Sequence, residues 1–422
     1  MLISVVLLLS LAIGVPIAFA VMLAIFTYLT SAGMPVTLLA QRTFMGLDSF
    51  SILAIPLFVL AGELMNASGI TSRIIQLANA LVGHFKAGLA QVNVWASVIF
   101  AGLSGSAVAD TSALGRVFVP AMEKEGYPKS FAAALTASSS VIGPIIPPSI
   151  PAIIYALIVP GVSVPALFLA GVVPGVLLAT MLSIYVFVFA GHYASRHPRL
   201  SLKDKLVALK NGLVPLLMPV FIVVSIVAGV VTPTEAAAFA AAYALFAGFV
   251  LLKSLKLKDL PGIFVTSMRD SSTILLIIGV VAAANWLMTF NGIPQAISAY
   301  VLDMVTSPFT FLMLILVLLL VVGFLLEGMA AMLVLVPILH PIAMSFGIDP
   351  VHFAIVVIFN LMIGLITPPM GLCLFVADSV SNVGMAALTR RIIPMFFVEV
   401  LVLLIITFVP ATVTTLPRLF GF

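Results

Sequence analysis

The sequence predicts an all-α polytopic membrane protein of two inverted repeats, each with a re-entrant helical hairpin and a transmembrane helix broken at a Pro-Pro pair. The 422-residue chain is 63% hydrophobic and only 8% charged, whereas soluble domains carry about 25% charged residues. Apolar runs long enough to span a bilayer recur along the chain. The segments VIGPIIPPS (141–149) and MIGLITPPM (362–370) each interrupt such a run with a glycine and a pair of adjacent prolines, which break helical hydrogen bonding.

The apolar runs define the expected spans. They lie at 1–13, 16–30, 50–66, 131–160, 164–190, 213–231, 236–252, 271–290, 351–373 and 392–414. The first run is short for a full span. We read residues 1–30 as mature membrane helix, because they contain neither a charged n-region nor a small-residue cleavage site. Two further apolar stretches, 88–118 and 309–340, are interrupted in the middle.

The placement of Lys and Arg sets the expected topology, because short cytoplasmic loops carry an excess of positive charge. The basic segment HYASRHPRLSLKDKLVALK (192–210) is expected to be a cytoplasmic loop. Counting spans outward from it puts every other Lys and Arg on the same side except Arg42 and Arg418. This bias holds only if 88–118 is a hairpin open to the cytoplasm and 309–340 one open to the outside.

The two breaks belong to an internal repeat with an offset of 221 residues. The matched positions are Gly143, Pro147 and Pro148 with Gly364, Pro368 and Pro369, and Gly102 with Gly323. In inverted-repeat transporters such breaks form the site, with half-helix N-termini facing anions and unwound carbonyls binding Na⁺ or H⁺. A simple proline kink is the alternative for either pair alone. We expect a first repeat over 1–200, with hairpin 88–118 and broken helix 131–160, and a second over 201–422, with hairpin 309–340 and broken helix 351–373.

The middle of the first hairpin, GLSGSAVADTSALG (102–115), gathers polar residues in an apolar segment. Glycine lets the backbone turn sharply, and hydroxyl and carbonyl oxygens are ligands for hard cations. The candidate ion or substrate residues here are Ser104, Gly105, Ser106, Asp110 and Thr111. An intramembrane carboxylate is a functional candidate, but Asp110 could equally cap the second arm of the hairpin.

The remaining candidates lie at the breaks and in the second hairpin. They are Gly143, Pro147, Pro148 and Ser149, then Gly323 and Glu327, then Gly364, Thr367, Pro368, Pro369 and Gly371. The sequence leaves three roles open for Glu327: a proton-titrating group, a neighbour of an ion site or a helix cap. The hydroxyls at the breaks, including those of Ser139 and Ser140, could instead bond back to carbonyls in the preceding turn.

Other polar residues in the apolar runs are weaker candidates. Glu235 in TPTEAAA fits a first-turn acid behind a helix cap. His340 and His352 lack metal-ligand spacing. The rest are Glu63 and Asn66, expected near the cytoplasmic interface, and Asn285, Asp378 and Glu399, open between structural and functional roles.

Several kinds of chemistry are absent from the sequence. There is no G-x-x-x-x-G-K-[ST] motif for ATP hydrolysis and no basic soluble domain for nucleic-acid binding. The single Cys373 excludes an internal disulfide and a multi-cysteine metal site. Two rival functions stay open: a stand-alone ion-coupled dicarboxylate carrier, and an intramembrane enzyme using Asp110 and Glu327 as paired acids.

The chain resembles the large membrane subunit of TRAP (tripartite ATP-independent periplasmic) transporters over nearly its whole length. The resemblance rests on GLSGSAVADTSALG, IGPIIPPSIP, LFLAGVVPG, TPTEA and GIDPVHF…NLMIGLITPPMG. It implies a non-enzymatic secondary transporter without a cofactor, in the cytoplasmic (inner) membrane of bacteria or archaea. It also implies an elevator-type mechanism, in which a mobile domain carries both hairpins.

The resemblance further implies the partners, the driving ion and the cargo. The partners are a separate small four-helix membrane subunit and a soluble periplasmic substrate-binding protein. Sodium drives the import of an organic acid, such as a C4-dicarboxylate, a sialic acid or a related carboxylate. We accordingly expect Na⁺ near Ser104, Ser106, Ser149 and Thr367.

Overall fold

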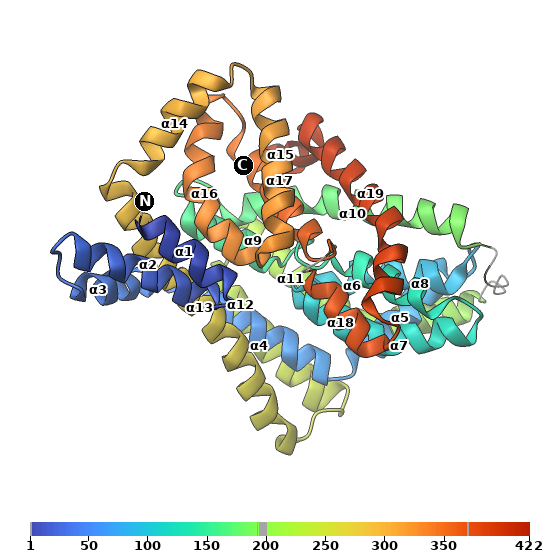
Figure 1. Ribbon diagram of the computed structural model, residues 1–422. Coiled ribbons are helices and arrows are strands. Elements are labelled where there is room, and N and C mark those ends of the chain that lie inside the picture. Colours follow the sequence, from blue (N-terminus) through green and yellow to red (C-terminus); the bar gives the residue numbers. More distant parts are fainter. Residues whose placement is uncertain (1, 192, 194–200, 369–370) are drawn as a thin grey trace.

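A computed structural model describes residues 2–191, 193, 201–368 and 371–422, and all of its described secondary structure is helical. The helices up to residue 189 are α1 (Leu2–Ala12), α2 (Ile17–Ser31), α3 (Thr37–Leu47), α4 (Ala54–Ala67), α5 (Ile70–Val82), α6 (Gly88–Ser104), α7 (Ala107–Lys124), α8 (Lys129–Ser140), α9 (Ile150–Ile158) and α10 (Val164–Phe189). Figure 1 shows them running from blue to green.

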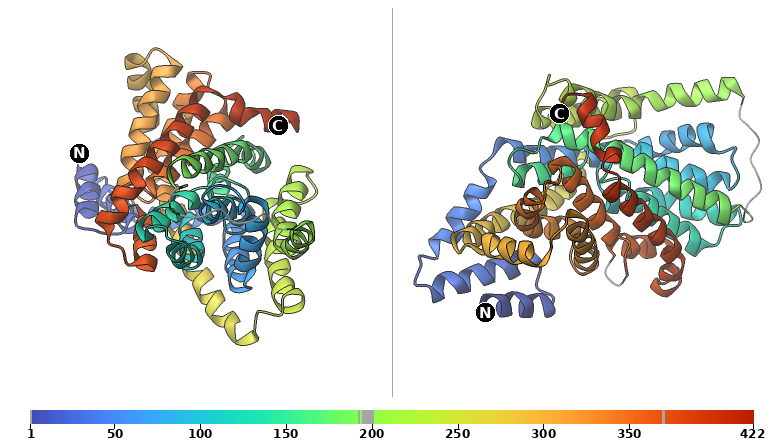
Figure 2. Two further views of the ribbon diagram at one scale, coloured as in Figure 1. Left: turned by 90° about the vertical axis from the view of Figure 1, so that its right-hand side faces the viewer. Right: turned by 90° about the horizontal axis from the view of Figure 1, so that it is seen from above.

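The later helices complete the bundle. They are α11 (Leu202–Val227), α12 (Pro233–Phe246), α13 (Leu260–Phe290), α14 (Ile293–Met304), α15 (Pro308–Leu325), α16 (Gly328–Ser345), α17 (Pro350–Gly364), α18 (Leu372–Ser381), α19 (Met385–Phe408) and α20 (Ala411–Leu419). Helices α1 to α3 lie at one end of the molecule, where α3 packs along α13 (Figures 1 and 2).

Helix boundaries follow the offset found in the sequence. Shifting α7 by 221 residues reproduces both ends of α16, and the same shift moves the start of α10 onto the start of α19. The packing is also paired. Helix α7 packs on α18 and α16 on α9; α8 packs on α19 and α17 on α10; α4 packs on α12 and α13 on α2. In each of these three cases a contact between the halves has a counterpart with the roles of the halves exchanged.

The centre of the bundle is formed by α8 and α17. Every residue of α8 from Phe131 to Ser140 is buried, and so is every residue of α17 from His352 to Gly364. Helix α8 is rich in alanine and serine, and small side chains let neighbouring membrane helices approach closely. A helix that is buried all round needs its polar groups satisfied by neighbours.

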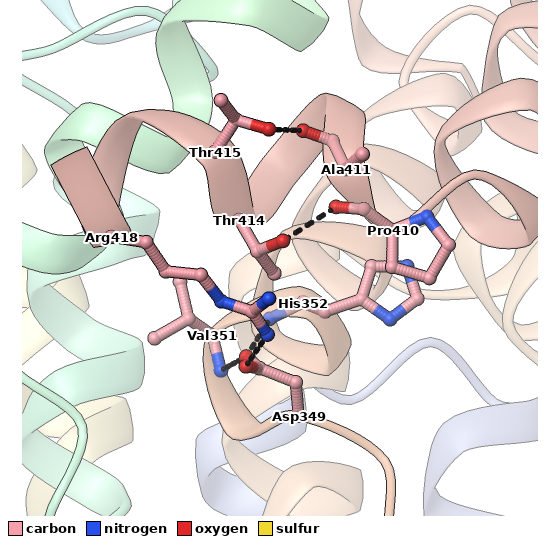
Figure 3. Close-up of polar contacts among 8 residues, drawn as sticks. All are labelled: Asp349, Val351, His352, Pro410, Ala411, Thr414, Thr415 and Arg418. Carbon is pink, nitrogen blue, oxygen red and sulfur yellow. Dashed lines mark hydrogen bonds and ion pairs between the residues drawn. The ribbon is translucent and has the colours of Figure 1, made fainter.

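The C-terminal helix α20 is fastened across the start of α17 (Figure 3). Asp349 caps α17 by accepting from the backbone N–H groups of Val351 and His352, both at 3.0 Å, and it pairs with Arg418 at 3.3 Å. The ring Nε2 of His352 lies 2.9 Å from the Ile406 carbonyl oxygen. Exposed ion pairs contribute about 0–1 kcal/mol, so packing against α10 and α17 supplies most of the attachment.

Among the described residues, eight helical segments are long and apolar enough to cross a membrane, which confirms an all-helical polytopic membrane protein. They are Phe50–Ala67, Val164–Phe189, Leu202–Val227, Pro233–Leu251, Leu257–Phe290, Pro308–Leu325, Gly328–Ser345 and Met385–Phe408. The broken helices expected over 131–160 and 351–373 are present as the pairs α8/α9 and α17/α18.

Several boundaries differ from expectation. The basic segment 192–210 is not all loop, because Ser201 accepts from the Asp204 N–H at 3.1 Å and starts α11 at Leu202; residues 192 and 194–200 lie outside the described part. Helix α13 is longer than the expected 271–290. Helices α3, α5 and α14 were not expected, since each is too short for the span criterion. A break after Phe408 divides the span expected over 392–414 into α19 and α20.

Candidate functional site

A cavity of about 710 Å³ lies where the two hairpins, the two breaks and three flanking helices meet. The tip between α6 and α7 and residues Glu327 and Met329 of the second hairpin line it, as do Pro144 and Leu365 from the breaks. Helices α2, α4 and α13 complete the wall. Small-molecule sites commonly occupy about 300–1,000 Å³.

The first hairpin turns at Gly105, whose φ of 59° suits glycine. Ser106 then begins α7, with its Oγ accepting from the Ala109 N–H at 3.4 Å. Ser104 Oγ donates to Asp110 Oδ1. Asp110 is fully buried behind the cavity wall, and its Oδ2 has no hydrogen-bond partner among the described residues. The cap of α7 is therefore Ser106, while Asp110 braces the turn from behind.

The first break, 141–149, ends in a strong helix cap. Ser149 Oγ accepts from the Ala152 N–H at 3.1 Å and donates to the Pro144 carbonyl at 2.5 Å. The same hydroxyl thus starts α9 and holds the unwound segment. Its two bonds occupy the side chain, so any contribution to a cation comes through the remaining lone pair.

The first tip and the first break are in close contact, through backbone at Gly105 and against the Asp110 side chain at Gly143. A Cβ on Gly105 would lie 2.7 Å from the Pro148 carbonyl oxygen, and a Cβ on Gly143 would lie 2.5 Å from Asp110 Oδ2. Only glycine fits such approaches. Pro147 and Pro148 lie in the same unwound stretch. The candidate residues of 104–149 are therefore one contiguous structure.

The second hairpin turns at Glu327, which caps α16. Its Oε1 accepts from the Met329 N–H at 3.0 Å and its Oε2 from the Ala330 N–H at 2.8 Å. A carboxylate is stabilised at the positive end of a helix dipole. Of the roles left open by the sequence, the structure provides the helix cap, and Glu327 also lines the cavity.

The second break connects Gly364, the last residue of α17, to Gly371, the residue preceding α18. Thr367 Oγ1 donates back to the carbonyl four residues earlier at 2.9 Å, which is the local alternative for the hydroxyls at the breaks. Pro368 lies in the break. Pro369 lies outside the described residues.

Four helices, α7, α9, α16 and α18, begin at a hairpin tip or at a break, and we call them half-helices. Their N-terminal turns all reach the cavity. The lining residues are Ala107, Val108 and Ala109 of α7, Ile150 and Pro151 of α9, Met329 of α16, and Leu372 of α18. Backbone N–H groups at helix N-termini carry partial positive charge and favour anions. These turns contribute positive potential to the cavity from backbone, and no Lys, Arg or His is among its described lining residues. At α16 the N–H groups of Met329 and Ala330 already donate to Glu327.

The charged residues of the lining are acids. Glu63 of α4 is half-buried, Asp270 of α13 is exposed, and Glu327 belongs to the second tip. Both Glu63 and Asp270 line the cavity from helices that pack against each other. Sequence reasoning missed Asp270 and its lining neighbour Thr273. An acid in an otherwise apolar helix signals function, but the expected span began only at residue 271.

Other polar candidates lie away from the cavity and bond either within their own helix or to a neighbouring helix. Thr111 Oγ1 bonds to the Ala107 carbonyl at 2.8 Å, and Ser139 Oγ lies 2.9 Å from Ser97 Oγ. Ser138 Oγ donates to Glu399 Oε1 at 2.5 Å, joining α8 to α19. Glu399 thus has a structural contact. Glu235 forms the expected capping box with Thr232.

The family model for the DctM component of the tripartite ATP-independent periplasmic transporter matches residues 4–412. The chain belongs to this family. It is a DctM-type large permease, a bacterial multi-pass membrane protein that transports organic acids and is not an enzyme.

Curated relatives match nearly the whole of this chain. The sialic acid TRAP transporter large permease SiaM of Vibrio cholerae is 39% identical, covering 96% of each chain. The C4-dicarboxylate large permease DctM of Rhodobacter capsulatus is 36% identical, covering 97% of this chain and 96% of its own. The isethionate permease DctMQ of Oleidesulfovibrio alaskensis is 36% identical over 96% of this chain but only 64% of its own. That relative is therefore longer.

Two known structures share the fold of this DctM chain. The YdaH transporter of Alcanivorax borkumensis aligns with a TM-score of 0.57, covering 88% of both chains at 14% identity. MtrF of Neisseria gonorrhoeae aligns with a TM-score of 0.56, covering 87% of this chain and 83% of its own at 15% identity. At these identities the likeness concerns the fold alone.

Proposed function

We propose that the chain is the permease of a sodium-coupled importer of an organic acid: a C4-dicarboxylate, a sialic acid or a related carboxylate. The observation that carries this proposal is a single cavity lined by both hairpin tips and by the N-terminal turns of four half-helices. The helix N-termini in this wall favour a carboxylate without the help of a basic side chain. The relatives named for sialic acid and C4-dicarboxylates support the same cargo class.

Sodium would bind beside the cavity where oxygen atoms crowd the unwound backbone. Ser104, Ser106 and Ser149 bring hydroxyls to the first tip and break, and Thr367 does so at the second break. Oxygen ligands suit a small hard cation. A bound cation would add to the positive potential of the helix ends, so that ion and carboxylate favour each other's binding.

Alternating access would follow from two inverted repeats, 1–200 and 201–422. The paired packing of helices between the halves supports the repeat. Each hairpin, with its broken helix, would form half of a mobile domain that carries the cavity across the membrane as an elevator. Helices α2, α4 and α13, which close the cavity on the other side, would belong to the static scaffold.

The permease would need two partners. A soluble periplasmic binding protein would deliver the substrate, and a small four-helix membrane subunit would extend the scaffold. The longer relatives DctMQ and SiaT, in which this chain covers 64% and 66% of the length, support a second membrane component that is joined to the permease in those proteins.

Uptake by the reconstituted complex tests the proposal. Permease, small subunit and binding protein are assayed in proteoliposomes at fixed pH, without ATP, with external Na⁺ or with K⁺ in its place. Accumulation of the organic acid that needs inward Na⁺ is the expected result. Equal uptake in K⁺ would show that sodium is not the coupling ion, and an absolute need for ATP would reject secondary transport.

A further inference from the structure

The wall of the cavity is of two chemical kinds. Helix N-termini and the hydroxyl of Ser106 form one kind, which offers donors and partial positive charge. Glu327 also lies there, with both carboxylate oxygens accepting from backbone N–H groups of α16. Helices α4 and α13, which pack against each other, form the other and carry the carboxylates of Glu63 and Asp270. The first kind suits an anion, whereas the second repels one.

The acidic part of the wall is regular. On α4 the lining includes Glu63 and, three residues later, Asn66; on α13 it includes Asp270 and, three residues later, Thr273. Residues spaced by three lie on the same face of a helix. Each helix therefore presents one carboxylate and one neutral polar side chain to the cavity.

Basic neighbours do not convert this wall into an anion site. Arg269 precedes Asp270 in the chain, but Arg269 is not among the described lining residues. An ionised carboxylate only accepts hydrogen bonds. The part of a substrate that meets Glu63 and Asp270 must therefore donate.

Resting on the function proposed above, we propose that the substrate has one carboxylate and, away from it, a hydrogen-bond donor group, either ammonium or hydroxyl. The carboxylate lies at the half-helix N-termini, and the donor group is held by Glu63 and Asp270. A second carboxylate at that position is rejected by like charge. The two acids are thus specificity-determining residues, which favour amino or hydroxy acids over dicarboxylates.

Binding of three four-carbon probes tests this assignment. They are γ-aminobutyrate, γ-hydroxybutyrate and succinate, which differ in the group at the far end. Dissociation constants are measured calorimetrically on the permease with its small membrane subunit in sodium buffer. We expect both donor probes to bind about tenfold or more tighter than succinate, as a charge-assisted hydrogen bond allows.

The double variant E63Q/D270N removes both charges and nearly preserves shape. It should weaken γ-aminobutyrate about tenfold or more and strengthen succinate. The exposed acid Asp303 on α14 provides the control. D303N removes a charge away from the cavity and should leave the order of the three dissociation constants unchanged.

The proposal is overturned if wild type binds neither donor probe, if succinate binds as tightly as they do, or if the preference survives in E63Q/D270N. Repeating the titrations in potassium separates the test of Glu63 and Asp270 from the test of sodium coupling. Binding that no longer depends on sodium refutes the coupling ion, whereas the order of the three probes still decides the role of the two acids.

Discussion

Gly364 at the end of α17 lies directly against Gly323 in α15, so closely that a Cβ on Gly364 would overlap the Gly323 carbonyl group and lie 2.7 Å from its Cα. The first arm of the second hairpin and the start of the second break are therefore in backbone contact. Both positions come from the repeat, and their contact ties a hairpin to its broken helix as one body.

Gly364→Ala should damage this body. Forcing a methyl group between two close backbones costs about 1–3 kcal/mol, so we expect a lower melting temperature of the purified complex and strongly reduced uptake. Gly262→Ala is the control, because Gly262 lies in α13 and a Cβ added to it would meet nothing within 4 Å. Replacing a helical glycine there should stabilise by about 0.5–1 kcal/mol. Equal behaviour of the two variants would contradict the contact.

Ser149→Ala should separate a helix cap from an ion-binding role. Loss of an N-cap costs about 1 kcal/mol. Ser163 caps α10 by accepting from the Ala166 N–H at 3.3 Å and is not among the residues that line the cavity, so Ser163→Ala removes a cap of the same kind as a control. Only Ser149→Ala should also raise the sodium concentration needed for half-maximal uptake. Identical sodium curves for the two variants would remove Ser149 from the ion site.

Glu399→Gln should be tolerated, whereas Ser138→Ala should not. Ser138 donates to Oε1 of the fully buried Glu399, whose Oε2 has no partner among the described residues. Leaving a buried carboxyl without its donor costs about 1–3 kcal/mol, while an amide can still accept from Ser138. Melting temperatures of the detergent-purified complex check this, and a stable Ser138→Ala would show that the bond contributes little.

Topology can be tested with two exposed positions. In a Cys373→Ala background, single cysteines replace Lys124, at the end of α7, and Met304, at the end of α14. An impermeant thiol reagent applied to right-side-out vesicles should label the second and spare the first, because the hairpins open to opposite faces. Labelling of both from outside would contradict the inverted arrangement.

Much of the fold follows from composition and from one offset. Glycine and proline interrupt helices through their backbone geometry. Gly143, Pro147 and their counterparts therefore locate the breaks without tertiary information. Amphipathic helices such as α5 escape a search for long apolar runs. The full length of α13 was also missed, because MRDSST reads as a polar boundary although it continues the helix.

The site was predictable in part for the same reason. Ser104, Ser106 and Glu327 line the cavity as their positions in the hairpins suggested. Thr111 instead bonds to a carbonyl of its own helix and Ser139 to Ser97 of a neighbouring helix. Local sequence does not say which side of a helix faces a cavity. The approach of α4 to α13 depends on tertiary packing, so the meeting of Glu63 and Asp270 could not be read from either segment alone.

Substrate protection at the two hairpin tips tests the central claim most directly. Val108 of the first tip and Met329 of the second both line the cavity, and each is replaced by cysteine in the Cys373→Ala background; Cys373 itself is fully buried. A third variant, Ser307→Cys at the base of α15, serves as control. With sodium and the transported acid present, labelling should slow about tenfold or more at both tips and stay unchanged at residue 307, as expected when one ligand occupies a shared cavity. Protection at only one tip, or at neither, would contradict a single substrate site between the hairpins.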